Sequence, residues 1–252
     1  MYKKISVALI LFFAVCSNVF ASPLSLEWNA FVGQFQQLKI AVEQSKYETA
    51  TYHFQRMNND FPKMLKTIEL TTEGYHEFTE CMIDLGITLR ALQTDERQLQ
   101  FQLKRMSLVV DAIHNSKHPV YLSSVNVLRD DLLTSINNKQ LHHIELLKSA
   151  VELHYDRWKI IRSAMIISNK TTFVSKIDSM FTHIRSRDDV DAMLKGLELL
   201  SSELSDSQQT VFLHVEDFKM NHTFMIYFVI LFFSVSFVLV YALRKIYLHE
   251  NR

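Results

Sequence analysis

Cysteine is nearly absent from this chain of 252 residues, which has only Cys16 and Cys81. Cys16 lies in an apolar run close to the N-terminus, so the rest of the chain keeps a single thiol. An intrachain disulfide is impossible in that part, which excludes the disulfide-built scaffolds of many small secreted proteins. A hydrophobic core must therefore hold the fold together.

Glycine and proline are equally scarce. The four glycines, Gly33, Gly74, Gly86 and Gly196, stand far apart, so the P-loop, the G-x-G-x-x-G fingerprint and the G-x-S-x-G nucleophile elbow are all missing. Three prolines in 252 residues also give too few turns for an all-β sandwich. Both absences favour a helical protein without a glycine-rich phosphate site.

The N-terminus has the pattern of a secretory signal peptide. Lys3 and Lys4 precede an uncharged apolar run over residues 5–16, and Val19-Phe20-Ala21 leads to Ser22. The run is too short to span a bilayer, so the sequence predicts a signal peptide over residues 1–21. An uncleaved N-terminal anchor is the alternative. Lipidation of Cys16 is excluded because Val15, which is not a small residue, precedes it.

The C-terminus contains a long apolar run. Residues 224–243 are uncharged and span about 30 Å as a helix, the thickness of a hydrocarbon core. Arg244 and Lys245 follow directly, which places the tail on the cytoplasmic side by the positive-inside rule. The sequence thus predicts an extracytoplasmic domain over 22–222, a single transmembrane helix over 223–243 and a short tail over 244–252.

The predicted extracytoplasmic segment is net acidic. The chain has 27 basic and 27 acidic residues. Five basic residues but only one acidic residue, Glu250, lie outside residues 22–222, which leaves a net charge of −4 there. A mixed-sign, acidic surface does not attract polyanions, so nucleic acid is not expected as a partner.

Apolar residues recur at spacings of three and four almost throughout residues 22–222. Ser22-Pro23 predicts a first helix start, and the capping box Ser45-Lys46-Tyr47-Glu48 predicts a second. Asn58-Asn59-Asp60 and Pro62 predict a break or kink. Further helices are expected at 64–92, 95–115, 119–137, 139–167, 171–185, 188–204 and 206 onward. The fold class is all-α, either a helical bundle or a short solenoid of helical hairpins.

Two residue patterns have part of the spacing of a metal site. Glu73-Gly74-Tyr75-His76 has the E-x-x-H spacing that places two ligands on one helical face in di-iron bundles, but such a site needs a second pair, and the chain has none. Asp111-Ala112-Ile113-His114 would need further carboxylates from other helices. No catalytic residue, metal site or cofactor is therefore predicted.

Aromatic residues at helical spacing supply the candidate site. Trp28, Phe31, Tyr47 and Phe54 are expected on the first two helices and are predicted to line a partner-binding groove. The alternative is that these rings form the core of the helical hairpin.

The layout resembles a known family, the membrane-anchored sporulation protein YpjB family of endospore-forming bacilli. The residues that carry the likeness are Leu26-Glu27-Trp28 in the opening helix and Lys46-Tyr47-Glu48-Thr49-Ala50 after it, together with the signal peptide, the polar helical middle and the C-terminal membrane helix with its basic tail. The resemblance implies a role in sporulation, and it assigns no catalytic residues to positions of this sequence.

These observations together predict a non-enzymatic protein of the cell membrane that is anchored by one helix. Its bulk is expected outside the cytoplasm, where it would bind another envelope or membrane protein. A ligand-sensing input subunit acting through a membrane partner is the alternative function, and an envelope hydrolase or metal enzyme is a third. The sequence does not specify the oligomeric state.

Overall fold

The computed structural model describes residues 26–91, 95–116 and 118–216, and over those ranges the chain is all-helical. The all-α prediction is thus confirmed. The elements are α2 (Leu26–Glu43), α3 (Tyr47–Leu65), α4 (Thr72–Arg90), α5 (Glu96–His114), α6 (Tyr121–Asn137), the 3-10 helix η1 (Lys139–His142), α7 (Ile144–Ile167), α8 (Thr171–Arg185) and α9 (Val190–Glu216).

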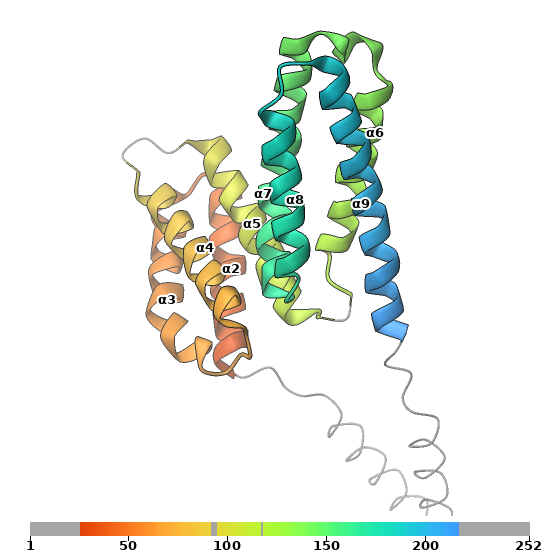
Figure 1. The fold of residues 1–252 in the computed structure, drawn as a ribbon. Coiled ribbons are helices and arrows are strands. Elements are labelled where there is room, and N and C mark those ends of the chain that lie inside the picture. Colours follow the sequence, from red (N-terminus) through yellow and green to blue (C-terminus); the bar gives the residue numbers. More distant parts are fainter. Residues whose placement is uncertain (1–25, 92–94, 117, 217–252) are drawn as a thin grey trace, which may run out of the picture. The chain divides into compact units, whose positions relative to one another are not determined.

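Helices α2, α3 and α4 lie side by side (Figure 1) and share an aromatic cluster. The Phe31 ring lies 5.9 Å from Trp28, 6.1 Å from Phe61 and 5.8 Å from Phe78, measured between centroids. Phe61 and Phe78 are 5.1 Å apart in an edge-to-face arrangement, which suits the quadrupoles of the two rings. Each of the three helices contributes at least one of these rings, so burial of the cluster holds the three together.

Helix α7 is the element with the most neighbours, because it contacts α4, α5, α6 and α8. Trp158 of α7 packs against Phe173 and Phe181 of α8 at centroid distances of 6.5 and 6.4 Å. Helices α4 and α5 both contact α7, although α6 separates them from α7 in the sequence. Packing is therefore not confined to helices that follow one another in the chain.

Two helical hairpins, α2–α3 and α7–α8, are closed by the same kind of turn. Ser45 and Asn169 both have positive φ, 56° and 60°. The next residue donates its backbone N–H five residues back, Lys46 to Ala41 and Lys170 to Met165, at 2.8 and 2.9 Å. This is the pattern of a Schellman motif, which satisfies the last carbonyls of the first helix.

The predicted cap at Ser45 is therefore wrong. Helix α3 begins at Tyr47 after Lys46, which makes no side-chain cap. Ser45 is instead the left-handed residue that ends α2, where its backbone N–H donates to Val42 at 2.8 Å. Ser45 thus terminates α2 and does not start α3, because the turn between these helices needs a residue with left-handed φ at this position.

The predicted break at residues 58–62 does not occur, and the predicted helix start at residue 64 is wrong. Helix α3 passes through Asn58-Asn59-Asp60 and contains Pro62 in its last turn, where buried Phe61 and Met64 keep it packed. The expected helix over 64–92 is interrupted before α4. Thr71 caps α4 by accepting a hydrogen bond from the backbone N–H of Gly74 at 3.1 Å.

At the other end, α9 continues through Ser205, so the predicted helices over 188–204 and from 206 onward are one. Residues up to 204 belong to one compact unit and those from 205 to a second. In the first unit, Met193, Leu197, Leu200 and Leu204 are buried. Their spacing of three and four reaches Leu204, directly before the expected helix start, so the last turn before that point is packed as helix.

No helix within the described ranges is long and apolar enough to cross a membrane. The predicted signal peptide (1–21), transmembrane helix (223–243) and tail (244–252) lie outside the described residues, as does the predicted helix start at Ser22-Pro23.

Two glycines inside helices give a matched pair of stability predictions. A Cβ added at Gly86 would lie 2.5 Å from Cζ of Phe54, whereas one added at Gly33 meets nothing within 4 Å. We expect Gly33→Ala to stabilise the protein by about 0.5–1 kcal/mol, since alanine loses less backbone entropy in a helix. Gly86→Ala should destabilise it by about 1–3 kcal/mol through overpacking.

Urea unfolding followed by helical circular dichroism measures both changes. Equal effects of the two substitutions would contradict the packing of α4 against Phe54.

Candidate functional site

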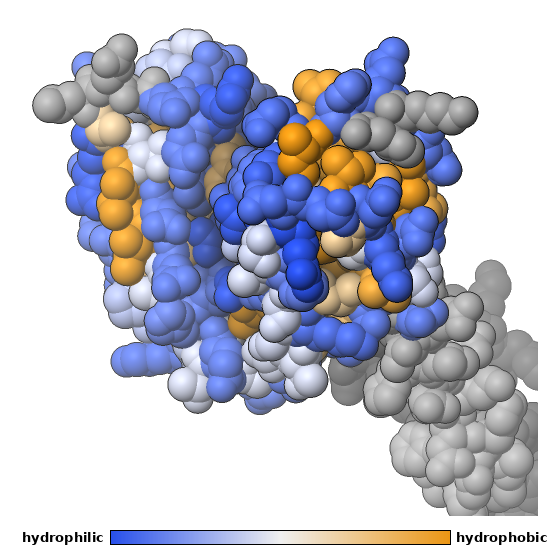
Figure 2. Space-filling model, turned by 45° about the horizontal axis from the view of Figure 1, so that its top comes forward, coloured by the Kyte–Doolittle hydropathy of each residue, from blue (hydrophilic) through white to orange (hydrophobic). Residues whose placement is uncertain are grey.

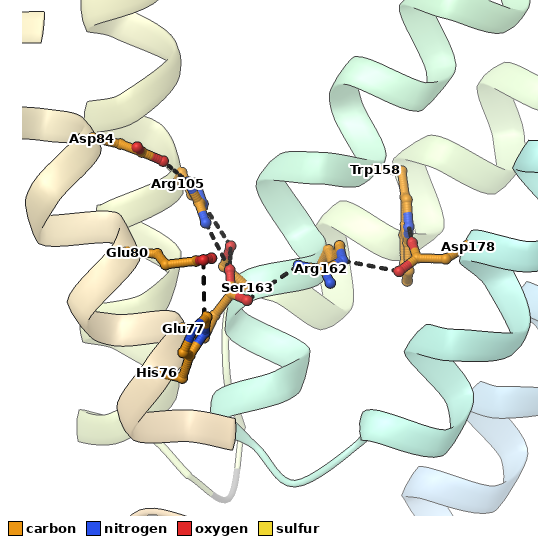
Figure 3. A network of polar contacts seen from close by, with 9 residues as sticks. All are labelled: His76, Glu77, Glu80, Asp84, Arg105, Trp158, Arg162, Ser163 and Asp178. Carbon is orange, nitrogen blue, oxygen red and sulfur yellow. Dashed lines mark hydrogen bonds and ion pairs between the residues drawn. The ribbon is translucent and has the colours of Figure 1, made fainter. Parts of the chain in front are cut away.

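A buried carboxylate lies at the centre of the most extensive polar cluster in the described residues. Glu77 of α4 has a side chain that is only 4% exposed, and both of its oxygens are hydrogen-bonded. Oε1 accepts from Nη2 of Arg105 at 2.7 Å, and Oε2 accepts from Nη1 of Arg162 at 3.1 Å. Figure 3 shows these residues converging from α4, α5 and α7. Glu77 thus links three helices.

Ser163 of α7 completes the inner part of this network. Its hydroxyl donates to Oε1 of Glu77 at 2.6 Å and accepts from Nε of Arg105 at 2.6 Å. Arg105 also donates through Nη1 to Oδ2 of Asp84 at 2.7 Å. Each nitrogen of the Arg105 guanidinium therefore has an acceptor, and the hydroxyl is used in both directions.

The network extends outward to α8 through Arg162. Nε of Arg162 donates to Oδ2 of Asp178 at 2.9 Å, and Nε1 of Trp158 donates to Oδ1 of the same carboxylate at 2.6 Å (Figure 3). Asp178 therefore ties the two residues of α7 to α8. We refer to Glu77, Asp84, Arg105, Trp158, Arg162, Ser163 and Asp178 as the polar network.

Electrostatics inside the network favour the charged forms of Glu77, Arg105 and Arg162. Burial alone would raise the pKa of Glu77, but hydrogen bonds from Ser163 and Arg105, together with the charges of Arg105 and Arg162, outweigh it and hold this pKa below its ordinary value. Burial works against the charge of Arg162 as well, yet its hydrogen bond to Asp178 and the charge of Glu77 raise its pKa. Glu77 is thus ionised at neutral pH, and its lowered pKa makes it a weaker base than an ordinary glutamate.

The remaining cysteine lies beside the network. Cys81 of α4 is buried, and burial raises the pKa of its thiol to about 12. The thiol is therefore protonated at neutral pH, which is the unreactive form. Cys81 acts as a small apolar residue in the core.

Two hollows open on either side of Arg162. One of about 490 Å³ is bounded by α4, α5, α7 and α8, and its lining includes Asp84, Arg97, Phe101 and Lys159. The other, of about 390 Å³, is lined by residues at the starts of α4 and α8, among them Thr72 and Thr171. Arg162 belongs to both linings, so the network forms the partition between them.

The aromatic residues predicted to form a groove lie mainly in the core. Trp28, Phe31 and Phe54 are buried, and Tyr47 is half-buried against the core. The structure brings Trp28 and Phe31 together in the aromatic cluster, whereas Phe54 lies against Gly86. Partner contact at these four residues stays a prediction.

The acidic residues and histidines of the two candidate metal patterns do not cluster with further ligands in the described residues. Within the described ranges, no group of three or more His, Cys, Asp or Glu side chains could hold a metal ion. Nδ1 of His76 lies 3.7 Å from Oε1 of Glu80 in an exposed pair. Of the other histidines, His154 is buried between α6 and α7, with its Nε2 2.9 Å from Oγ of Ser135.

Sequence reasoning missed the polar network, although a signal for it is present. Glu77 lies between Gly74 and Cys81 on the apolar side of its helix, and Arg105 lies beside the apolar residues Leu103 and Met106. A charged residue placed within an apolar stripe must be paired if it is buried, which is the pattern that could have identified these residues.

The model of the sporulation protein YpjB family matches residues 32–248. The chain belongs to this family. The predicted resemblance to the YpjB family is thereby confirmed, and with it the association with sporulation. Neither the curated proteins nor the solved structures contained a match.

Proposed function

We propose that this YpjB-family chain is a membrane-anchored, non-enzymatic protein that docks another envelope or membrane protein during sporulation. The family match supports the process. The apolar run over residues 224–243 supports the anchor. The charged side chains of the polar network form ion pairs with one another. This pairing supports a structural role for them in place of a catalytic one.

The observation that supports docking best is an exposed ridge on α4. Beyond Thr72 and Glu73 in its first turn, the exposed residues of this helix form one line along its surface: His76, Glu80, Ile83, Ile87 and Arg90. Ile83 and Ile87 are 52% and 60% exposed. These two adjacent β-branched side chains form a small apolar area on an otherwise polar ridge, which a partner could cover.

Other apolar side chains are exposed to a similar degree, among them Val127 and Leu199, but Ile83 and Ile87 lie one turn apart on the same helix. In the view of Figure 2 most side chains are hydrophilic, and hydrophobic ones gather in a few separate places. A partner helix with apolar residues at spacings of three and four would cover Ile83 and Ile87, while the charges of Glu80 and Arg90 would set its orientation.

In-cell crosslinking in the native host, during growth and during starvation, tests the proposal. We expect recovery of one defined envelope or membrane protein. It should be lost when residues 22–222 are replaced but 223–243 are kept.

The double variant Ile83→Glu/Ile87→Glu should abolish this crosslink, since it places two charges in the contact. Both side chains are exposed, so the fold should change in stability by no more than about 0.5 kcal/mol for each. Leu153→Glu on α7, at a residue that is 53% exposed, is the matched control. Undiminished crosslinking of the double variant would refute docking at the ridge.

A second function, ligand sensing through a membrane partner, is favoured by the 490 Å³ hollow. Its volume lies in the range of small-molecule sites, and its lining combines charged, amide and aromatic groups.

A further inference from the structure

The hollow of about 490 Å³ contains a positively charged and a negatively charged side chain that each keep an atom without a hydrogen bond in the described residues. Arg162 donates through Nε and Nη1, and Asp84 accepts through Oδ2. Within the described part of the chain, Nη2 of Arg162 and Oδ1 of Asp84 take part in no hydrogen bond, although both residues line the hollow. Their side chains are 34% and 43% exposed, so these atoms are open to a ligand.

The two groups are also fixed relative to each other. Asp84 bonds Arg105, Arg105 bonds Glu77, and Glu77 bonds Arg162, so one continuous chain of hydrogen bonds joins the free carboxylate oxygen to the free guanidinium edge. A ligand with an anionic and a cationic group would therefore meet partners that are held in place before it binds, which lowers the entropy cost of binding.

The rest of the lining suits a ligand with an apolar part and amide groups. Nζ of Lys159 lies 5.8 Å from the ring centroid of Phe101 and 5.2 Å from that of Tyr155. The two rings thus provide an apolar wall beside a cation. Oε1 of Gln102, a residue that is only 5% exposed, is buried without a hydrogen-bond partner in the described residues. An amide N–H of a ligand would satisfy it after a rotation of the Gln102 side chain.

The charge balance of the hollow selects the class of ligand. Asp156 and Lys159, which are paired at 2.7 Å, offset each other in this lining. Arg97 and Arg162 favour a carboxylate, but Asp84 would repel a purely anionic molecule. The two arginines would likewise repel a purely cationic one. We propose that the hollow binds a short peptide with free ends, whose carboxylate is bound by Arg162 and Arg97 and whose ammonium is bound by Asp84.

This inference is independent of the docking proposal, because the hollow and the α4 ridge are formed by different residues and are tested separately. A chain that crosslinks to no partner can still bind peptide, and a chain that binds no peptide can still dock through Ile83 and Ile87.

Titration of the full-length protein in detergent micelles with pooled Ala-Xaa-Ala tripeptides, followed by ligand-detected NMR, tests it. We expect binding of tripeptides with free ends. N-acetylated and C-amidated forms of the tripeptides that bind should each bind at least about tenfold more weakly, because each lacks one charged end.

A variant outside the polar network separates binding from folding. Arg97 is exposed at the start of α5, so Arg97→Ala should leave the fold intact and weaken peptide binding about tenfold. Arg129→Ala, which removes an arginine paired with Asp130 on α6, should leave binding unchanged. The proposal is overturned if no tripeptide binds, if blocked and free tripeptides bind equally, or if Arg97→Ala binds as the parent does.

Discussion

Glu77→Ala is expected to destabilise the protein by about 3–5 kcal/mol, the cost of leaving a buried charge without its partner. Arg105 has a side chain that is only 11% exposed, and in this variant it would lose its bond to Oε1 while remaining charged. Arg162 would lose its contact with Oε2, and the hydroxyl of Ser163 would lose its acceptor. Urea unfolding of the full-length protein in micelles, followed by circular dichroism, measures the change.

The matched control is Glu80→Ala on the same helix. Glu80 is half exposed and its partner, His76, lies at the surface, so the loss should be at most about 1 kcal/mol. Similar losses for Glu77→Ala and Glu80→Ala would contradict the burial of the polar network.

The same carboxylate predicts the sign of a pH dependence. The pKa of Glu77 in the folded chain is below its ordinary value of 4.5, so the unfolded chain takes up the proton first as the pH falls. Its stabilising contribution is therefore complete above pH 4.5 and is lost as the pH falls through the lowered pKa. In Glu77→Ala, this part of the acid destabilisation should disappear.

Phe31→Ala is expected to cost about 3–5 kcal/mol, because it opens a cavity in the core of α2, α3 and α4. The Phe31 side chain is buried and contacts the rings of Trp28, Phe61 and Phe78. Unfolding in urea measures the loss. Tyr52→Ala on α3 is the control, since half of Tyr52 is exposed and the change should be small.

This prediction bears directly on the predicted aromatic groove. If Phe31 is core, Phe31→Ala abolishes partner crosslinking only through loss of folded protein, and lowering the temperature should restore it. A variant that stays fully folded yet loses the partner would instead favour the groove.

A helix could be predicted from the sequence where a capping residue stands directly before a run of apolar residues at helical spacing. The helix expected over 171–185 is α8, with identical bounds, and the one expected over 95–115 is α5, whose Asp95 cap accepts from the backbone N–H of Gln98. The boundary near residue 70 was missed because Thr71 is one of several polar residues that could cap a helix. Only packing of both neighbouring helices decides between such positions.

The site was less predictable than the fold, for a physical reason. Glu77 and Ser163 are 86 residues apart and meet only because α4 packs against α7. Periodicity reports which side of a helix is apolar, but it carries no information about which two helices share a side. The four aromatic residues predicted to line a groove do lie on helices. Their periodicity could not tell a buried core from an exposed groove, because both give the same spacing.

The polar network also has a consequence for helix alignment. Sliding α4 along α7 by one helical turn moves its side chains by about 5.4 Å, well beyond the reach of a hydrogen bond. Apolar residues such as Phe78 and Met82 would still meet apolar neighbours after such a slide, whereas Glu77 would leave both arginines behind. We therefore expect the network to select one longitudinal register of α4, α5 and α7 from several that hydrophobic packing alone would tolerate.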